Sequence, residues 1–354
     1  MGGPAGLSDD DLVAHALAVH VLSGDDTEVY DACVAELQRR GSVGIRDRAL
    51  GLLADERAEA RALGADVLAQ LGKAAGTLHL EASVGPLLAL AAVEADPLVL
   101  DSVVGALGHL GDQRALAVVL AAGGHPSYRV RSAAAKALPG LADLGFLDED
   151  HPIVTALMTL TADEEHEVRN WATFGLGALV RVDGSRTRAV LAGILDDPDD
   201  DTRAEALAGL ARRRDPAVIA AVAAGLEAGE VGRLGVSAAA LLSSSVLLAG
   251  LQGLVGWWDV DESLLVTALR NCDPVAQTAE IAMLAQLVEA GAVYAPGTHL
   301  VVESELLPVD DGRPMIRFDD DGSVPPTSVE ALLTAAEGSP RRAVEMLLAS
   351  GSVR

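Results

Sequence analysis

The stretch VRSAAAKAL at residues 130–138 returns as VRNWATFGL at residues 168–176. Both copies place a branched residue before an arginine, a small residue three positions after it and a leucine seven positions after it. The same pattern occurs six times between Val29 and Ala211, and the residue at the arginine position is the anchor of each copy. The six anchors are Tyr30, Arg61, Leu100, Arg131, Arg169 and Arg203.

The position seven after each anchor is leucine in every copy: Leu37, Leu68, Leu107, Leu138, Leu176 and Leu210. Successive anchors are 31 to 39 residues apart, which is the period of stacked helical hairpins. We therefore expect each hairpin to contribute one leucine to a shared interior. Half of the 354 residues are hydrophobic but only 3% are aromatic, so alanine, leucine and valine must fill that interior. Such a composition favours an all-α fold.

Each copy opens the second helix of a hairpin, and the residue six before the anchor lies in the turn that precedes it. From the second repeat to the sixth these turn residues are Asp55, Glu94, His125, Asp163 and Asp197, and Gly24 takes the place in the first. Aspartate caps helix starts, and proline suits the first helical positions, as in Asp96-Pro97. The first helices are expected at residues 82–94, 114–122, 153–161, 186–195 and 217–227.

These runs, with Val130-Arg131 before Ala134 and Leu138, resemble HEAT repeats of the short variety also found in phycobilin lyases. The resemblance covers residues 12–290 and implies a right-handed α-solenoid. It also implies a ladder of bonds between adjacent repeats, made by the turn acid and the second-helix arginine. The matching residues are Asp55 with Arg61, Asp163 with Arg169 and Asp197 with Arg203, and Arg131 stands at the same arginine position. Because Tyr30 and Leu100 lack the guanidinium and His125 replaces the acid, the ladder is expected to break at the first, third and fourth units.

After Arg203 the pattern blurs, with degenerate units expected around Leu234 and Ala276. Residues 291–326 change composition and predict a β-hairpin insert, with an irregular acidic loop as the alternative. In this insert the turn signal is Asp310-Asp311-Gly312. Thr327-Ser328 is expected to start a helix, and Ser339-Pro340 a last one. The predicted organisation is a solenoid over 1–290, the insert over 291–326 and capping helices over 327–354.

The net charge of the chain indicates which kinds of partner it can bind. With 52 acidic and 26 basic side chains the net charge is −26, which repels nucleic acid and anionic membranes and attracts cationic partners. Two cysteines and an acidic start at Asp9-Asp10-Asp11 favour the cytoplasm. The uncharged run from Leu234 to Trp258 is long enough for a membrane span, but its serine triplet is expected to separate two shorter helices.

No catalytic, metal or cofactor signature is found. The histidines lack the spacing that presents two imidazoles to zinc, and Thr202 replaces the glycine that a calcium loop around Asp197 would need. Cys33 lies at a small-residue position of its repeat and is expected to be buried. We therefore expect no cofactor and no enzymatic activity.

Positions two, five and nine after each anchor are expected to line the inner face of the solenoid. In the fifth repeat two of them are aromatic, Trp171 and Phe174. We take this pair as a candidate aromatic anchor for a partner, with packing beneath the next helix as the alternative. Neighbouring repeats offer His109, Lys136, Glu205 and Arg212 at comparable positions.

Three functions are compatible with these features. The first is an interaction scaffold that binds a protein or peptide of basic character in its acidic curve. The second is an immunity or inhibitor protein that neutralises a toxin or mimics nucleic-acid charge. The third is a lyase-like enzyme, for which no acid and base pair is evident in the sequence.

Overall fold

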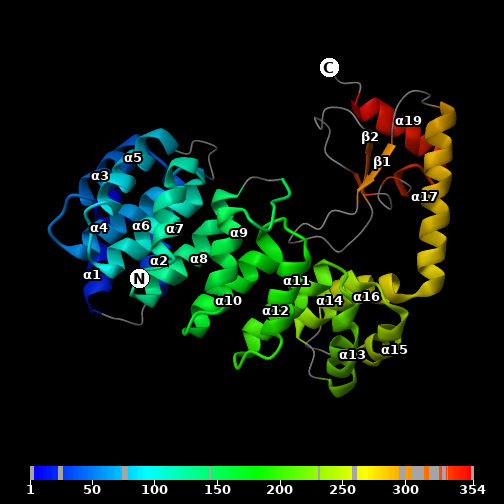
Figure 1. Ribbon diagram of the computed structural model, residues 1–354. Coiled ribbons are helices and arrows are strands. Elements are labelled where there is room, and N and C mark those ends of the chain that lie inside the picture. Colours follow the sequence, from blue (N-terminus) through cyan, green and yellow to red (C-terminus); the bar gives the residue numbers. More distant parts are fainter. Residues whose placement is uncertain are drawn as a thin grey trace. The chain divides into compact units, whose positions relative to one another are not determined.

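The computed structural model describes residues 4–22, 27–73, 79–142, 145–229, 232–256, 261–294, 300–303, 315–318, 327–328, 332 and 334–351. The fold is helical apart from one small sheet, and the chain divides into two compact units, residues 1–203 and 204–354 (Figure 1). Gly24, Trp257-Trp258 and the turn signal Asp310-Asp311-Gly312 lie outside the described residues. The domain boundary placed at residue 290 stays a prediction.

The first unit is a row of helical hairpins. The first helices of the hairpins are α1 (Asp9–Leu22), α3 (Val43–Leu52), α5 (Leu80–Ala91), α7 (Leu116–Ala122), α9 (Pro152–Leu160) and α11 (Ser185–Ile194). The second helices are α2 (Thr27–Arg40), α4 (Ala58–Ala69), α6 (Pro97–Leu110), α8 (Tyr128–Ala137), α10 (His166–Phe174) and α12 (Asp200–Arg212), of which α12 crosses the boundary between the units. Short helical turns are η1 (Pro4–Gly6), η3 (Gln113–Ala115), η4 (Leu138–Leu141) and the π-helix η5 (Gly175–Leu179).

The predicted leucine core is confirmed. All six leucines are at most 1% exposed, and Cys33 is also buried. Helices α2, α4, α6, α8 and α10 pack against one another in sequence order. Figure 1 shows the part of this row from α6 through α8 to α10. They approach closely because small residues face each other: a Cβ atom added to Gly108 would lie 2.5 Å from the Cα atom of Ala137. The small residues of the repeat therefore set the spacing of the second helices.

An arginine clamp joins each of three repeats to the next. The guanidinium of Arg169 donates through Nε and Nη2 to the carboxylate of Asp197 in the following turn, at 2.7 and 3.0 Å. Its Nη1 donates to two backbone carbonyls in its own turn, those of Asp163 and Glu164, at 2.9 and 3.0 Å. One side chain thus holds two successive turns. Arg61 with Glu94 and Arg131 with Asp163 repeat the arrangement.

The turn acid is also fixed from its own side. Asp163 and Asp197 each accept a hydrogen bond from the backbone N–H two residues later, and Glu94 accepts from Ala95 and Asp96. The paired side chains are at most 18% exposed. Burial alone would raise the pKa of Asp163, but its bonds to Arg131 and to the backbone hold that pKa below its usual value. The carboxylates of the ladder are therefore stabilised in their charged form.

The ladder differs from the expected one in its partners and its gaps. Arg61, Arg131 and Arg169 each pair with the acid of the following repeat, whereas the carboxylate of Asp55 binds Arg57 and Arg203 pairs with Asp200. The matched pairs Asp55 with Arg61, Asp163 with Arg169 and Asp197 with Arg203 are joined only through the backbone carbonyl of the turn acid. The breaks expected at Tyr30 and Leu100 fit their lack of a guanidinium. The break expected at the fourth unit is wrong. Within its own turn Arg131 donates to the backbone carbonyl of His125, so the lack of an acidic side chain at this position does not break the contact. Arg131 also binds Asp163 of the next repeat, as the other clamps do.

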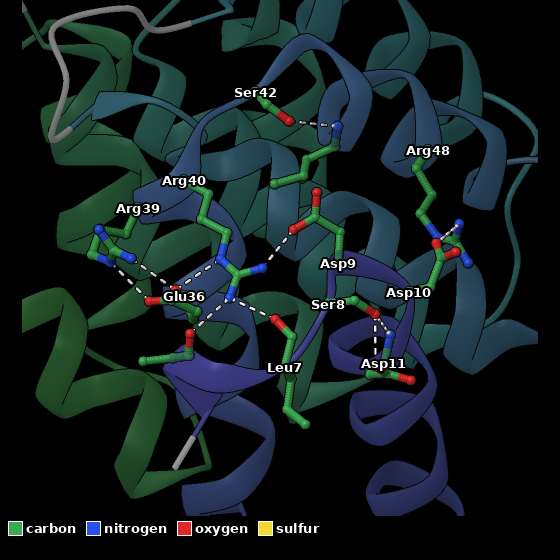
Figure 2. Close-up of polar contacts among 12 residues, drawn as sticks. Leu7, Ser8, Asp9, Asp10, Asp11, Glu36, Arg39, Arg40, Ser42 and Arg48 are labelled. Atoms are coloured by element: carbon green, nitrogen blue, oxygen red, sulfur yellow. Dashed lines mark hydrogen bonds and ion pairs between the residues drawn. The ribbon is translucent and has the colours of Figure 1, made fainter. Parts of the chain in front are cut away.

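The N-terminal end of the row has its own polar network, shown in Figure 2. Arg40, at the end of α2, donates to the carboxylates of Glu36 and Asp9 and to the backbone carbonyl of Leu7. Arg48 on α3 pairs with Asp10. These contacts tie Leu7 and the first turn of α1 to α2 and α3.

In the second unit the helices are less regular in length than in the first. Beyond α12 it contains η6 (Pro216–Val218), α13 (Ile219–Ala228), α14 (Arg233–Leu242), η7 (Ser245–Leu247), α15 (Leu248–Gly253) and α16 (Glu262–Cys272). Leu241 is buried, which fits a degenerate repeat around Leu234. The serine triplet separates α14 from α15 as expected, with Ser243 in the left-handed conformation at φ 51°. Among the described helices, none combines the length and apolarity that a bilayer crossing needs.

The repeat expected around Ala276 is wrong. Residues 274–294 form one continuous helix, α17 (Pro274–Tyr294), with Val275 and Met283 exposed rather than in a core. Leu287 instead packs with Leu332, Ala336, Ala343 and Leu347, where the last two lie on α19 (Pro340–Gly351). The long helix is thus covered by the C-terminal segment and not by another hairpin.

The predicted β-hairpin is present. Strands β1 (Leu300–Glu303) and β2 (Met315–Phe318) pair antiparallel, with Leu300 opposite Phe318. Thr327-Ser328 does not start a helix as expected. It forms β3 (Thr327–Ser328), which pairs with β2 because its β-branched threonine extends the sheet in the order β1-β2-β3. The final helix begins at Pro340, directly after Ser339 as predicted.

We expect the clamp to dominate the stability of the first unit. In Arg169→Met, Asp197 would keep its partly buried charge without a cation, and the substitution should cost about 3 kcal/mol at pH 7. The ionised Asp197 has a lowered pKa in the fold, so its contribution is present above about pH 4 and is lost as the pH falls. The difference between the two proteins should therefore shrink in acid. Urea titrations followed by circular dichroism at several pH values measure this.

Arg39→Met is the matched control. Arg39 is 64% exposed and Glu36 keeps Arg40 as a partner, so the loss should stay within about 0.5 kcal/mol. Equal losses in the two variants would contradict the special role of the clamp.

Candidate functional site

The aromatic pair of the fifth repeat lies on α10 beside a lysine of α8. The rings of Trp171 and Phe174 meet edge to face, with centroids 6.0 Å apart. The Nζ atom of Lys136 lies 5.0 Å from the Trp171 ring centroid and 3.0 Å from Glu167 Oε1. Trp171 is 37% exposed, whereas Phe174 is half-buried. The tryptophan therefore presents a face to solvent that a cation–π contact already orients. Its binding role stays a prediction.

The other sequence candidates lie elsewhere. His109 lies near the end of α6, where partial removal of its ring from water, together with the charge of Lys73, lowers its pKa. Glu205 and Arg212 are half-buried residues of the second unit, within reach of each other's charge. The structure thus brings Trp171, Phe174 and Lys136 together, and His109 lines a separate groove.

This groove is a hollow in the first unit with a volume of about 890 Å³. The second helices α2, α4 and α6 line it, together with Arg129 from the start of α8. Its polar lining includes four carboxylates, from Asp31, Asp66, Asp96 and Asp101, but only one guanidinium. We call it the acidic groove.

Asp66 on α4 is the most enclosed of these carboxylates. The hydroxyl of Tyr30 donates to its Oδ2 atom at 2.5 Å, and the hydroxyl of Ser102 donates to the same carboxylate. Burial is the main reason why the pKa of Asp66 rises to about 6, and the charges of Asp101 and Asp31 raise it further. Hydrogen bonds from the two hydroxyls oppose this rise but do not cancel it.

Asp101 connects the acidic groove to the aromatic pair. Burial raises its pKa, the charges of Lys136 and Arg129 act in the opposite direction, and Glu167 adds to the rise. Lys136 contacts both the ring of Trp171 and the carboxylate of Glu167. A polar surface therefore runs from Tyr30 on α2 to Trp171 on α10 across five successive second helices.

Sequence reasoning missed the centre of this surface, although a signal for it was present. Asp66 stands five positions after its anchor Arg61, the same place that Lys136 and Phe174 occupy in their repeats. Asp31 and Asp101 each follow their anchor directly. Attention to the rare aromatics hid the recurrence of aspartate in the first three repeats.

Comparison with known proteins agrees with the helical repeats. A family model described as HEAT repeats matches residues 84–173. No curated protein sequence matches the chain. Among solved structures, the Escherichia coli protein YibA is similar with a TM-score of 0.55 and 22% identity, over 76% of this chain and 93% of that one. This likeness shows the fold alone.

Two further structures align more loosely. A designed armadillo repeat protein has a TM-score of 0.38 and 16% identity, over 57% of this chain and 98% of its own. Human deoxyhypusine hydroxylase, solved in complex with glycerol, has a TM-score of 0.28 and 17% identity, over 76% of this chain and 96% of its own. Neither supports an argument about activity.

Replacing the enclosed carboxylate should stabilise the protein. In Asp66→Asn the amide oxygen still accepts a hydrogen bond from Tyr30, but no charge is buried, and the gain at pH 7 should be about 2 kcal/mol. A raised pKa in the fold means that the wild type loses stability as the pH rises from about 4 to about 6. The variant should therefore match the wild type near pH 4 and exceed it above pH 6. Thermal unfolding over this pH range checks the prediction, and a less stable variant at pH 7 contradicts it.

Proposed function

We propose that this HEAT-repeat protein is an interaction scaffold that binds a protein or peptide of basic character along the acidic groove of its first unit. The observation that carries the proposal is the groove itself, which places four carboxylates and one guanidinium in a hollow of about 890 Å³. Such a surface attracts cationic segments and repels phosphate backbones. Helical repeat proteins in general use extended surfaces of this kind to bind their partners.

Trp171 supports the same proposal at the other end of the surface. Large rigid side chains supply most of the energy at binding hot spots, and Trp171 is exposed beside the groove's neighbour Lys136. A bound chain that follows the groove from α2 to α8 would reach this ring on α10. The proposal assigns no catalytic step to the protein, and it includes the cytoplasmic location that the sequence favours.

Blocking the groove should abolish partner binding without harming the fold. A Cβ atom added to Gly105, which lines the groove on α6, meets no atom within 4 Å, so Gly105→Trp has room to project into the hollow. Affinity capture from the native cell followed by mass spectrometry should recover at least tenfold less of the partner with this variant. Trp171→Ala should reduce recovery too, because truncating a hot-spot tryptophan typically costs more than about 2 kcal/mol.

Gly51→Trp is the control for the added indole. Gly51 is exposed on α3, also has no atom within 4 Å of an added Cβ, and does not line the groove. Its partner recovery should equal that of the wild type. A partner that binds all four proteins alike would show that the interaction lies on another surface.

A further inference from the structure

Asp66 differs from the other enclosed acids of the first unit in what surrounds it. The ladder acids Glu94, Asp163 and Asp197 each receive a guanidinium from the preceding repeat. Asp66 receives only the hydroxyls of Tyr30 and Ser102, and its charged neighbours Asp31 and Asp101 have the same sign. Within the described residues no basic side chain forms an ion pair with it.

The place of Asp66 makes this arrangement more than an acidic cluster. Its carboxylate lines a hollow of about 890 Å³, and Asp31, Asp101 and Ser102 line the same hollow from the two flanking helices. A carboxylate taken out of water is costly unless a cation compensates it. Since the ladder acids Glu94, Asp163 and Asp197 are each compensated by an arginine of the protein, the open side of Asp66 points to a cation from outside.

We propose that the acidic groove seats a cationic side chain, arginine or lysine, of an extended peptide, with Asp66 as the central contact and Asp31 and Asp101 on either side. The inference rests on the proposed function and specifies its ligand. A side-chain cation suits the site better than a metal ion, because the carboxylates come from three different helices and one oxygen of Asp66 already accepts from Tyr30. No group of metal-ligating side chains is found among the described residues.

The dimensions of the groove agree with a peptide. Neighbouring helix axes are about 8–10 Å apart, so four second helices span about 30 Å. An extended chain covers this distance with about nine residues. Alternate side chains of such a chain point to the same side, which would place several cations along the row of carboxylates from Asp31 to Asp101.

A labelled nonamer of alternating arginine and glycine tests the proposal by fluorescence anisotropy. The wild type should bind it, and should not measurably bind the same peptide with citrulline in place of arginine. Asp66→Asn should weaken binding at least tenfold. Asp47→Asn removes the same charge from an exposed position on α3 and should change the affinity less than twofold. Equal losses in the two variants would overturn the proposal, because the attraction would then come from the overall charge alone.

Proton release on binding distinguishes a cation in direct contact with Asp66 from one held only by the overall charge of the groove. Because a cation beside Asp66 lowers its pKa, peptide binding near pH 6 should release protons from the wild type but not from Asp66→Asn. Calorimetry in buffers of different ionisation enthalpy detects the release. The other titratable or charged groups that face the groove are Asp31, Asp96, Asp101, Tyr30, Arg129 and His109, so the difference between the two proteins, and not the total, is the readout. Equal proton release from both proteins would overturn the assignment to Asp66.

The outcomes distinguish this inference from the proposed function. If the nonamer fails to bind while Gly105→Trp still blocks partner capture, the cation seat is wrong and the scaffold function stands. If spermidine binds as tightly as the nonamer, the groove recognises small polycations and the peptide assignment is overturned. Because Asp66→Asn is expected to be the more stable protein, lost binding cannot be attributed to unfolding.

Discussion

The arrangement of the first unit depends on one interaction, the arginine that bridges two consecutive turns. A guanidinium has five donors in a fixed plane, and Arg169 uses that geometry to bind a carboxylate on one side and two backbone carbonyls on the other. A lysine could not satisfy both turns at once. The clamp therefore couples the conformation of one turn to the position of the next helix, while the buried leucines supply the apolar contact that the coupling aligns.

The gaps in this ladder explain where the groove lies. Tyr30 and Leu100 occupy the anchor position without a guanidinium, and α2 and α6, which carry them, also supply Asp31 and Asp101. At Tyr30 the anchor side chain bonds to Asp66 in the groove instead of to the next turn. The first and third repeats thus lack the clamp, and the helices that carry their anchors also line the acidic groove. Under the proposed function, the loss of a structural contact and the gain of a binding surface would have one origin in the sequence.

The helices and the core could be predicted because both follow from a local period. The leucine seven after each anchor and the turn six before it are set by helix geometry, and the described structure places all six leucines inside. The partners in the ladder are harder to predict, because its bonds join residues about 30 positions apart. The sequence does not show which turn an arginine side chain reaches. For this reason the break at His125 was wrong, since a backbone carbonyl substitutes for the missing acid.

The acidic groove could not be found by residue type alone. An aspartate on a helix is usually a solvated side chain, and only the packing of α2, α4 and α6 reveals that Asp66 is enclosed. Tyr30 shows the same difficulty. Its position in the sequence indicates only that a ladder arginine is missing, whereas the structure shows that its hydroxyl donates to Asp66 in the groove. The buried charge of Asp66 lowers the stability of the fold, and yet the hydroxyls of Tyr30 and Ser102 hold its carboxylate in place. Natural proteins accept such costs mainly where a ligand compensates them, which is why we assign the groove to binding and not to packing.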